Sequence, residues 1–451
     1  MASPLRRRIL KISTIVLASL LGLVCLAVGG AIVFLQGERM GAFVTSLVPE
    51  MRGKLEFRSI RWPARLLVDI LAKRPTPMVV EGVKFYDPEG SVVLDVPHLT
   101  VALELHQLID GSGLFMHDLD VGPDSYWRFG RMQKTKRGIG FLEVFKAKKR
   151  GRPSPPKPPG APKEKGFVVR IFNAQLNGLR VVFDFPHVWG FDLRDVHAPA
   201  WLHVEDDFVG WEAVDLEARA GGFLTVLDQV LPFDSVKVKQ VATLREYSDD
   251  IFLDLTEGKT GHSTLVGKGF FNGIYADDSV SAIHMHTEFH DAPDALNAVL
   301  KPMNIPGLRL GGEHAHVNTD LMGPYVSIAI TTDLGGLDVS YDQITARDLV
   351  LRADLQFDPK SKASVPNASV EELSFSSPGG GRVLTKLDLA VPKLQTQLKF
   401  DRFSVDSYLP ASLRPLAAGK LHGQISASVD FDETMSAVKQ GRLSNLDLTF
   451  D

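Results

Sequence analysis

The chain has 451 residues, of which 44% are hydrophobic and 23% are charged, and its net charge is −4. This length exceeds the roughly 250–300 residues at which a single hydrophobic core stops growing, so the sequence predicts several domains or an extended architecture. The slightly negative charge lacks the electrostatic footprint of nucleic-acid binding, and we expect no nucleic-acid partner. Cys25 is the only cysteine, which excludes an internal disulfide framework and a cysteine-ligated metal site.

The N-terminus carries a predicted membrane anchor. Residues 1–11 form a basic segment that includes Arg6, Arg7 and Arg8, and residues 12–35 form an uncharged apolar run. At 1.5 Å per residue this run makes about 36 Å of helix, which is enough to cross roughly 30 Å of hydrocarbon. A cleaved signal peptide is the alternative, but its apolar region is normally only about 7–15 residues long. The basic segment predicts a cytoplasmic N-terminus with the rest of the chain across the membrane.

From Met78 onward, apolar and polar residues alternate, which predicts β-strands because alternate side chains of a strand lie on one face of a sheet. Turn signals separate the predicted strands at 87–90, 177–178, 335–336 and 378–381. The apolar members of these runs are candidates to line one sheet face: Val83, Phe85, Val92, Leu94, Leu99, Val101, Leu103, Leu179, Val181, Phe183, Val326, Ile328, Ile330, Leu394, Leu398 and Phe400.

Helical signals are few and short, and they fall at 65–72, 294–300 and 405–416. Parallel βαβ folding needs a crossover helix between strands, so the scarcity of helices disfavours it. We therefore predict a mainly β protein with a few short helices at the joints between strands.

Residues 131–165 differ from the rest of the chain, because they hold twelve Lys or Arg and only two acids. The tract 153–162 is rich in proline, which lacks the N–H that a sheet ladder requires. We interpret this segment as a solvated, basic, Pro-rich loop between two strand-rich blocks. The alternative is a basic arm that touches anionic lipid headgroups.

Two segments of the chain are similar in sequence to each other. Arg309-Leu310-x-Gly312 and Lys420-Leu421-x-Gly423 each follow a predicted short helix and open a predicted strand. This recurrence predicts a repeated structural unit.

The order of motifs along the chain resembles that of a known family. After the predicted anchor comes a first strand at 53–62, followed by an Asp-Pro-x-Gly hairpin at 83–94 and an L-x-V-x-L run at 99–103. Two short motifs come next, one at 108–111 that ends in glycine and one at 119–121 that ends in valine. Together with the Leu421-x-Gly423 unit, these motifs resemble the AsmA-like family, which includes the TamB-type and YhdP-type proteins.

The resemblance implies a long, curved antiparallel β-sheet folded into a groove. Residues 36–130 would begin this groove, and residues 166–451 would continue it as AsmA-like repeats. It also implies a single-pass protein, anchored by residues 12–35 in the inner membrane of a diderm bacterium, with its body in the periplasm. Members are implicated in phospholipid transport and outer-membrane assembly, so phospholipid and an outer-membrane or periplasmic protein are the implied partners.

The alternation has a physical consequence for lipid binding. An apolar trough would accommodate acyl chains, because each buried methylene contributes about 0.8 kcal/mol. Alternation is equally typical of a β-sandwich whose apolar faces pack on each other. In that case the chain would be an anchored, non-enzymatic scaffold for envelope protein assembly or secretion.

No motif indicates an enzyme. The Gly258-Lys259-Thr260 segment is similar to part of a phosphate-binding loop, but Leu253 stands where that loop requires glycine. The chain contains neither a G-x-S-x-G elbow nor an H-E-x-x-H helix. We therefore predict a non-enzymatic protein that needs no cofactor.

Two His-x-His pairs, His284 with His286 and His314 with His316, are the candidates for a metal site. Each pair would point to one face of a strand, so two neighbouring strands could gather four imidazoles suited to zinc or copper. Polar residues on the exposed face of a sheet are the simpler interpretation, and we favour it.

Overall fold

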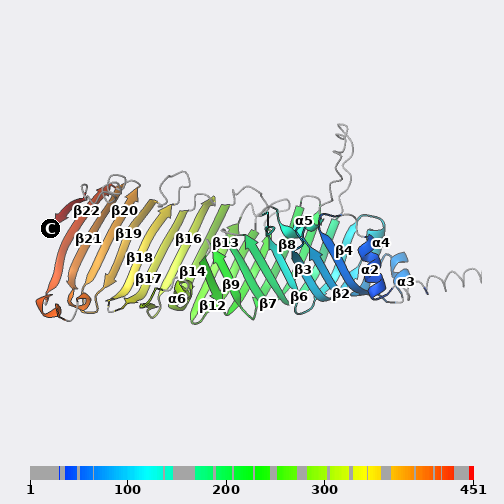
Figure 1. Cartoon of the computed structure of the whole chain (residues 1–451), viewed down its shortest axis with the longest axis horizontal. Helices are drawn as coiled ribbons and strands as arrows, with labels where there is room; N and C mark the ends of the chain where they lie inside the picture. Colours follow the sequence, from blue (N-terminus) through cyan, green and yellow to red (C-terminus); the bar gives the residue numbers. More distant parts are fainter. Residues whose placement is uncertain are drawn as a thin grey trace, which may run out of the picture. The chain divides into compact units, whose positions relative to one another are not determined.

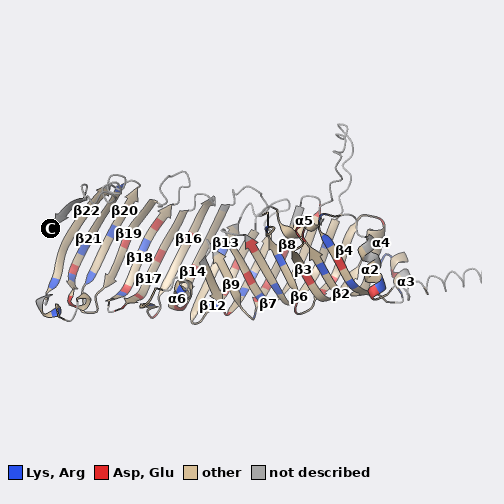
Figure 2. Cartoon of the chain, in the orientation of Figure 1, with Lys and Arg blue, Asp and Glu red and all other residues tan. Residues whose placement is uncertain are grey.

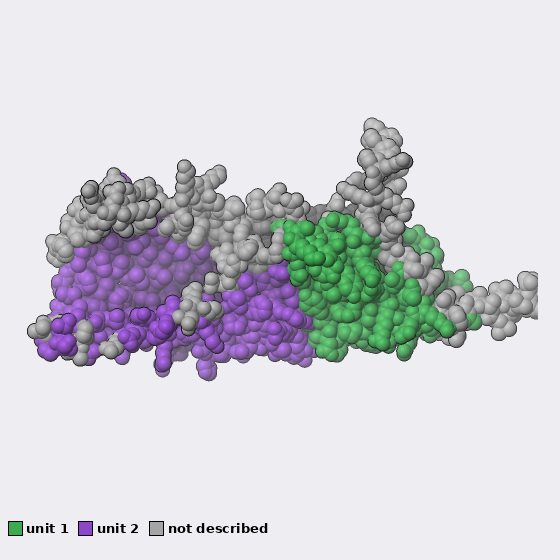
Figure 3. Space-filling model, in the orientation of Figure 1, with its two compact units in different colours: residues 1–179, 201–207 green, residues 180–200, 208–451 purple. Residues whose placement is uncertain are grey.

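The structure is a computed structural model. It describes residues 30, 36–47, 51–63, 65–135, 138–145, 168–185, 189–205, 208–226, 229–243, 251–271, 282–301, 305–324, 329–342, 344–356, 367–390, 393–409, 412–417, 419–430 and 446–450. The chain divides into two compact units, unit 1 (residues 1–179 and 201–207) and unit 2 (residues 180–200 and 208–451), which are coloured separately in Figure 3.

Most described elements are strands, as the alternation predicts, and Figure 1 labels many of them. The elements up to the middle of the chain are α2 (Glu38–Leu47), β1 (Lys54–Arg61), α3 (Leu66–Leu71), β2 (Thr76–Tyr86), β3 (Val92–Leu103), α4 (Leu105–Ile109), β4 (Gly113–Val121), β5 (Tyr126–Gly130), α5 (Gly140–Phe145), β6 (Val168–Phe185), β7 (Trp189–Glu205), β8 (Phe208–Ala218), β9 (Gly222–Val226) and β10 (Gln229–Phe233).

The remaining elements all belong to unit 2. They are β11 (Ser235–Thr243), β12 (Ile251–Thr260), β13 (Ser263–Phe271), β14 (Ala282–His290), α6 (Pro293–Leu300), β15 (Leu308–Gly311), β16 (His316–Pro324), β17 (Ala329–Tyr341), β18 (Ile344–Gln356), β19 (Asn367–Ser376), β20 (Arg382–Ala390), β21 (Lys393–Ser404), η2 (Asp406–Tyr408), η3 (Arg414–Ala417), β22 (Lys420–Asp430) and β23 (Leu446–Phe450).

Unit 1 contains one departure from the antiparallel sheet that we expected. Strands β1, β2 and β3 pair antiparallel in chain order, and β3 also pairs with β4 and β5. Strand β4, however, runs parallel to β6, from Gly113 opposite Val168 to Val121 opposite Leu176. A parallel pair needs a long connection, and residues 122–167 supply it.

Helix α5 lies within 131–165, which we predicted to be a loop throughout. Its Val144 is fully buried and packs with Leu55 and Val93 in a hydrophobic cluster. Phe141 of the same helix has its ring 6.5 Å from that of Phe85 and 5.7 Å from that of Trp127. The prediction is therefore wrong for 140–145, because these apolar residues are needed to cover the sheet. The basic and proline-rich residues 146–165 lie outside the described residues.

A glycine interrupts the strict alternation of β2. Val80 and Val83 are both buried, although they are three residues apart and strict alternation would place them on opposite faces of the sheet. Gly82 between them has φ +64, a left-handed conformation that a residue with a Cβ rarely adopts. A Cβ here would lie 2.7 Å from the Cβ of Arg58 on β1. The glycine thus allows the strand to change which face its apolar residues occupy.

In unit 2 most strands pair antiparallel with the next strand in the chain. The ladder runs from β8 through β11, β12, β13 and β14 to β16, and then in chain order through β17 to β23. Strand β9 joins β7 to β10. This pattern confirms the prediction of a mainly β protein.

The predicted helices and turns are confirmed in part. Helices α3 and α6 occur where expected, whereas the described part of 405–416 contains two short 3-10 helices, η2 and η3. Turns occur at 87–90 and 378–381, between paired strands. The pairs at 177–178 and 335–336 instead lie inside β6 and β17, so they are not hairpin turns.

The similar segments at 309–312 and 420–423 occur at similar places in the order of elements. The first copy passes from β14 through α6 to β15, where Arg309 and Leu310 follow Leu308, and the second passes from β21 through η2 and η3 to β22, which opens with Lys420 and Leu421. The first copy is split into β15 and β16 at Gly312, whereas the second continues as β22. The predicted span at 12–35 lies outside the described residues except for residue 30, and no helix in the described part of the chain is long and apolar enough to cross a membrane.

Candidate functional site

One face of the unit 2 ladder carries a continuous apolar row, which we call row A. Adjacent strands place its members directly opposite one another across eight strands, β14 and β16 to β22. At about 4.8 Å per strand the row is roughly 34 Å long. Its members are buried or half-buried: Met285, Leu321, Ile330, Leu355, Ala368, Leu389, Leu394 and Val429.

The neighbouring row, one residue along each strand, faces the other way and is polar. All eight of its members are exposed: His286, Asp320, Thr331, Asp354, Ser369, Asp388, Gln395 and Ser428. A sheet with one apolar and one polar face is expected to cover its apolar face with another layer or a ligand.

The polar face is held by charge pairs between neighbouring strands. Arg352 on β18 lies 3.4 Å from Asp333 on β17 and 3.3 Å from Glu372 on β19. Figure 2 shows charged residues of both signs on strands β18 to β21. Such residues favour exposure of this face to water.

Apart from their ladder neighbours, β18 and β21 also contact η2, where Phe403 of β21 stacks on Tyr408 with the ring centroids 5.4 Å apart. Tyr408 of η2 donates its hydroxyl proton to the carbonyl of Thr345, at 2.9 Å. In the space-filling view, the surface of unit 2 is hollowed along these strands (Figure 3).

Several predicted lining residues lie on this apolar face. Ile330 and Leu394 belong to row A, and Leu398 and Phe400 follow Leu394 at alternate positions of β21, where all three are half-buried. Val326 and Ile328 lie outside the described residues. The other row A members were not among the predicted lining residues, although the same alternation is present around each of them.

The predicted lining residues before residue 200 lie in a more enclosed setting. Val83, Val101, Leu179, Val181 and Phe183 are buried, and the other five are half-buried. Phe183 stacks on Phe191 with the ring centroids 4.5 Å apart.

The predicted lining residues Val92 and Leu94 of β3 are half-buried, and the residue between them is enclosed more deeply. Val93 is the fully buried side chain, packed with Leu55 and Val144. The reason is a register shift of the β2–β3 ladder between Phe85 and Tyr86, which alternation cannot reveal.

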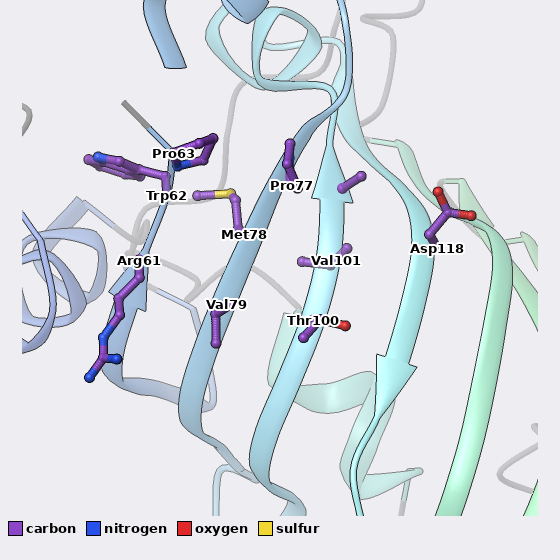
Figure 4. A pocket seen from close by; sticks show the side chains of 10 residues that line it. Arg61, Trp62, Pro63, Pro77, Met78, Val79, Thr100, Val101 and Asp118 are labelled. Atoms are coloured by element: carbon purple, nitrogen blue, oxygen red, sulfur yellow. The ribbon is translucent and has the colours of Figure 1, made fainter. Parts of the chain in front are cut away.

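Unit 1 also contains a cavity of about 570 Å³ that is widely open to solvent. Figure 4 shows Trp62, Pro63 and Met78 gathered at one end of it and Asp118 at the other. Val101 of β3, a predicted lining residue, forms part of its wall. The mainly apolar wall suits an apolar group such as an acyl chain.

The two histidine pairs do not come together. Strands β14 and β16 are paired, as a shared site requires, but the register places His286 opposite Asp320 and His316 opposite His290. No group of three metal-ligating side chains lies close enough to hold an ion in the part of the chain that the structure describes.

His286 instead belongs to an exposed ion-pair network. Its ring nitrogens lie 3.0 Å from Glu288 Oε1 and 2.7 Å from Asp320 Oδ1. Hydrogen bonds to Glu288 and then Asp320 raise the pKa of His286, because both carboxylates favour the protonated ring.

The comparisons with known proteins give no relative: no family model, curated protein or solved structure matches the chain.

Proposed function

We propose that this protein is an inner-membrane-anchored periplasmic carrier that binds phospholipid acyl chains along the apolar face of a β-groove and so supports outer-membrane biogenesis. The observation that carries the proposal is row A, an apolar row beside an exposed polar row that faces the other way. The envelope location and the role in outer-membrane assembly rest on the predicted anchor and on the resemblance to the AsmA-like family.

The contrast in exposure between the two faces supports a groove. Within one layer of sheet, the apolar side chains are buried or half-buried while their polar neighbours are exposed. Side chains crowd one another on the inner side of a curved sheet and spread apart on the outer side. An inner apolar face would exclude water from acyl chains, at about 25 cal/mol per Å² of apolar surface.

The ladder also supports movement of a lipid along the groove. Row A repeats similar aliphatic side chains at each strand, so neighbouring positions offer an acyl chain nearly equal contacts. Exchange between equivalent positions needs no large barrier, because as many apolar contacts form as are lost.

The first experiment is extraction of the purified full chain in mild detergent, followed by mass spectrometry of bound lipid. We expect phospholipid at one or more molecules per chain. A well-folded, lipid-free protein would contradict the carrier and favour the anchored scaffold.

Neighbouring residues of β21 provide a matched test of which face binds. Leu398 is half-buried on the apolar face, whereas Gln397 is exposed on the polar face. A photo-crosslinking amino acid at position 398 should form lipid adducts, and the same amino acid at position 397 should not. Equal labelling at both positions would count against the groove.

A further inference from the structure

Unit 1 has a cluster of exposed aliphatic side chains on two short helices, which we call the α3–α4 patch. Leu71 is 84% exposed and Val68 62% on α3, and Ile109 is 68% exposed and Leu108 42% on α4. Helices α3 and α4 contact each other. Aliphatic side chains gathered at this exposure mark an interaction surface more often than isolated ones do.

The exposure is a consequence of how α3 packs. Leu66 and Asp69 face inward and are buried, while Val68 and Leu71, three residues apart, share the outer face. Backbone bonds such as that from the Ala72 N–H to the carbonyl of Val68, at 2.9 Å, hold the helix in shape. The outer face is therefore apolar in a formed helix.

The patch is close in the chain to the end of the predicted anchor. Gln36, the first residue after the predicted span, donates a side-chain hydrogen bond to the carbonyl of Trp62 at 3.1 Å. Gly37 and Ile60 exchange two backbone hydrogen bonds, of 2.8 and 3.1 Å. Both contacts hold the residues that follow the predicted span against the end of β1. Helix α3 begins at Leu66, a few residues after the end of β1.

Basic residues flank the patch. Lys73 and Arg74 are exposed directly after α3, and the exposed Arg65 pairs with Asp69 at 3.2 Å. Asp110 is the exposed acid at the end of α4. Aliphatic side chains beside basic ones match the boundary between acyl chains and phosphate headgroups.

From these observations we propose that the α3–α4 patch inserts into the headgroup–acyl boundary of the bilayer that holds the anchor. The inference rests on the anchor in the proposed function. The patch would be a second attachment to the membrane, and it would fix the orientation of unit 1 relative to the bilayer. Trp62 and Pro63, between the anchor contact and α3, also line the cavity of unit 1, so the same segment would link the bilayer to that cavity.

The test uses the full chain with Cys25→Ser, reconstituted in vesicles of phosphatidylcholine and phosphatidylglycerol. Leu71→Cys and Ile109→Cys carry an environment-sensitive fluorophore, and Met322→Cys, at a residue that is 50% exposed on β16, is the control. A lipid with a spin label near its headgroup serves as the quencher. We expect quenching at 71 and 109 to exceed that at 322 severalfold.

Flotation of the vesicles reports on the anchor separately. Protein that floats but shows no more quenching at 71 and 109 than at 322 would overturn the patch and leave the anchor intact. Protein that fails to float would overturn both. Shielding of the labels only after addition of envelope proteins would assign the patch to a protein partner and overturn the membrane assignment.

Discussion

Leu389 lies directly opposite Leu394 in the β20–β21 ladder, and the next pair in the register, Asp388 with Gln395, faces the other way. The leucines are buried or half-buried and the polar pair is exposed. The two faces of the same two strands can therefore be changed independently.

Replacement of both leucines by asparagine should reduce lipid binding. Each change removes aliphatic surface worth about 1–2 kcal/mol, so we expect the lipid-to-protein ratio to fall at least about tenfold. Asp388→Asn combined with Gln395→Asn should leave the ratio unchanged. Quantitative lipid analysis of the purified variants measures both, and an equal loss in the two would argue against the apolar face as the binding surface.

Val144→Ala should lower the free energy of unfolding of unit 1 by about 2 kcal/mol, because it removes two buried methyl groups and leaves a cavity. Val68→Ala on α3, at a residue that is 62% exposed, should change it by less than about 0.5 kcal/mol. Chemical denaturation in detergent provides the comparison. Identical unfolding of the two variants would show that α5 is not part of the packed fold.

Gly82→Ala should destabilise unit 1 by about 2 kcal/mol, because alanine is strained at φ +64 and its Cβ would meet Arg58. Gly90→Ala separates the backbone strain from the steric clash with Arg58. Gly90 also has a positive φ, of +85, but nothing lies within 4 Å of a Cβ there. We expect a loss of about 1 kcal/mol at Gly90, and thermal unfolding of both variants tests the difference.

The raised pKa of His286 predicts a pH-dependent contribution to stability. The protonated ring is favoured in the folded state, so its contribution is complete below the unfolded pKa of about 6.5 and is lost as pH rises through the folded value. The effect should stay below about 1 kcal/mol because the ring and both carboxylates are about half exposed to water.

Melting temperature as a function of pH tests this contribution. Wild-type protein should lose a small part of its stability from about pH 6.5 upward, and His286→Gln should remove that component. Glu288→Gln should weaken it, since one of the two carboxylates remains. An unchanged pH profile in His286→Gln would place the dependence elsewhere.

The sequence was sufficient to predict the class of fold and the sides of many strands. Alternation is a local property, and the backbone converts it directly into faces, so Leu394, Leu398 and Phe400 lie together as expected. The turns at 87–90 and 378–381 were predictable for the same reason, because their residues determine the backbone conformation.

Long-range pairing decided what alternation could not. The parallel pairing of β4 with β6, the packing of α5 on the sheet and the register that separates His286 from His316 join residues far apart in the chain. The change of face at Gly82 depends on its left-handed backbone against β1, and the burial of Val93 depends on a shift of β3 against β2. Row A depends on both the sequence and the tertiary structure. The sequence by itself determined that apolar residues occupy alternate positions of each strand. Only the tertiary structure aligned those residues across eight strands, because register is set between strands and not within them.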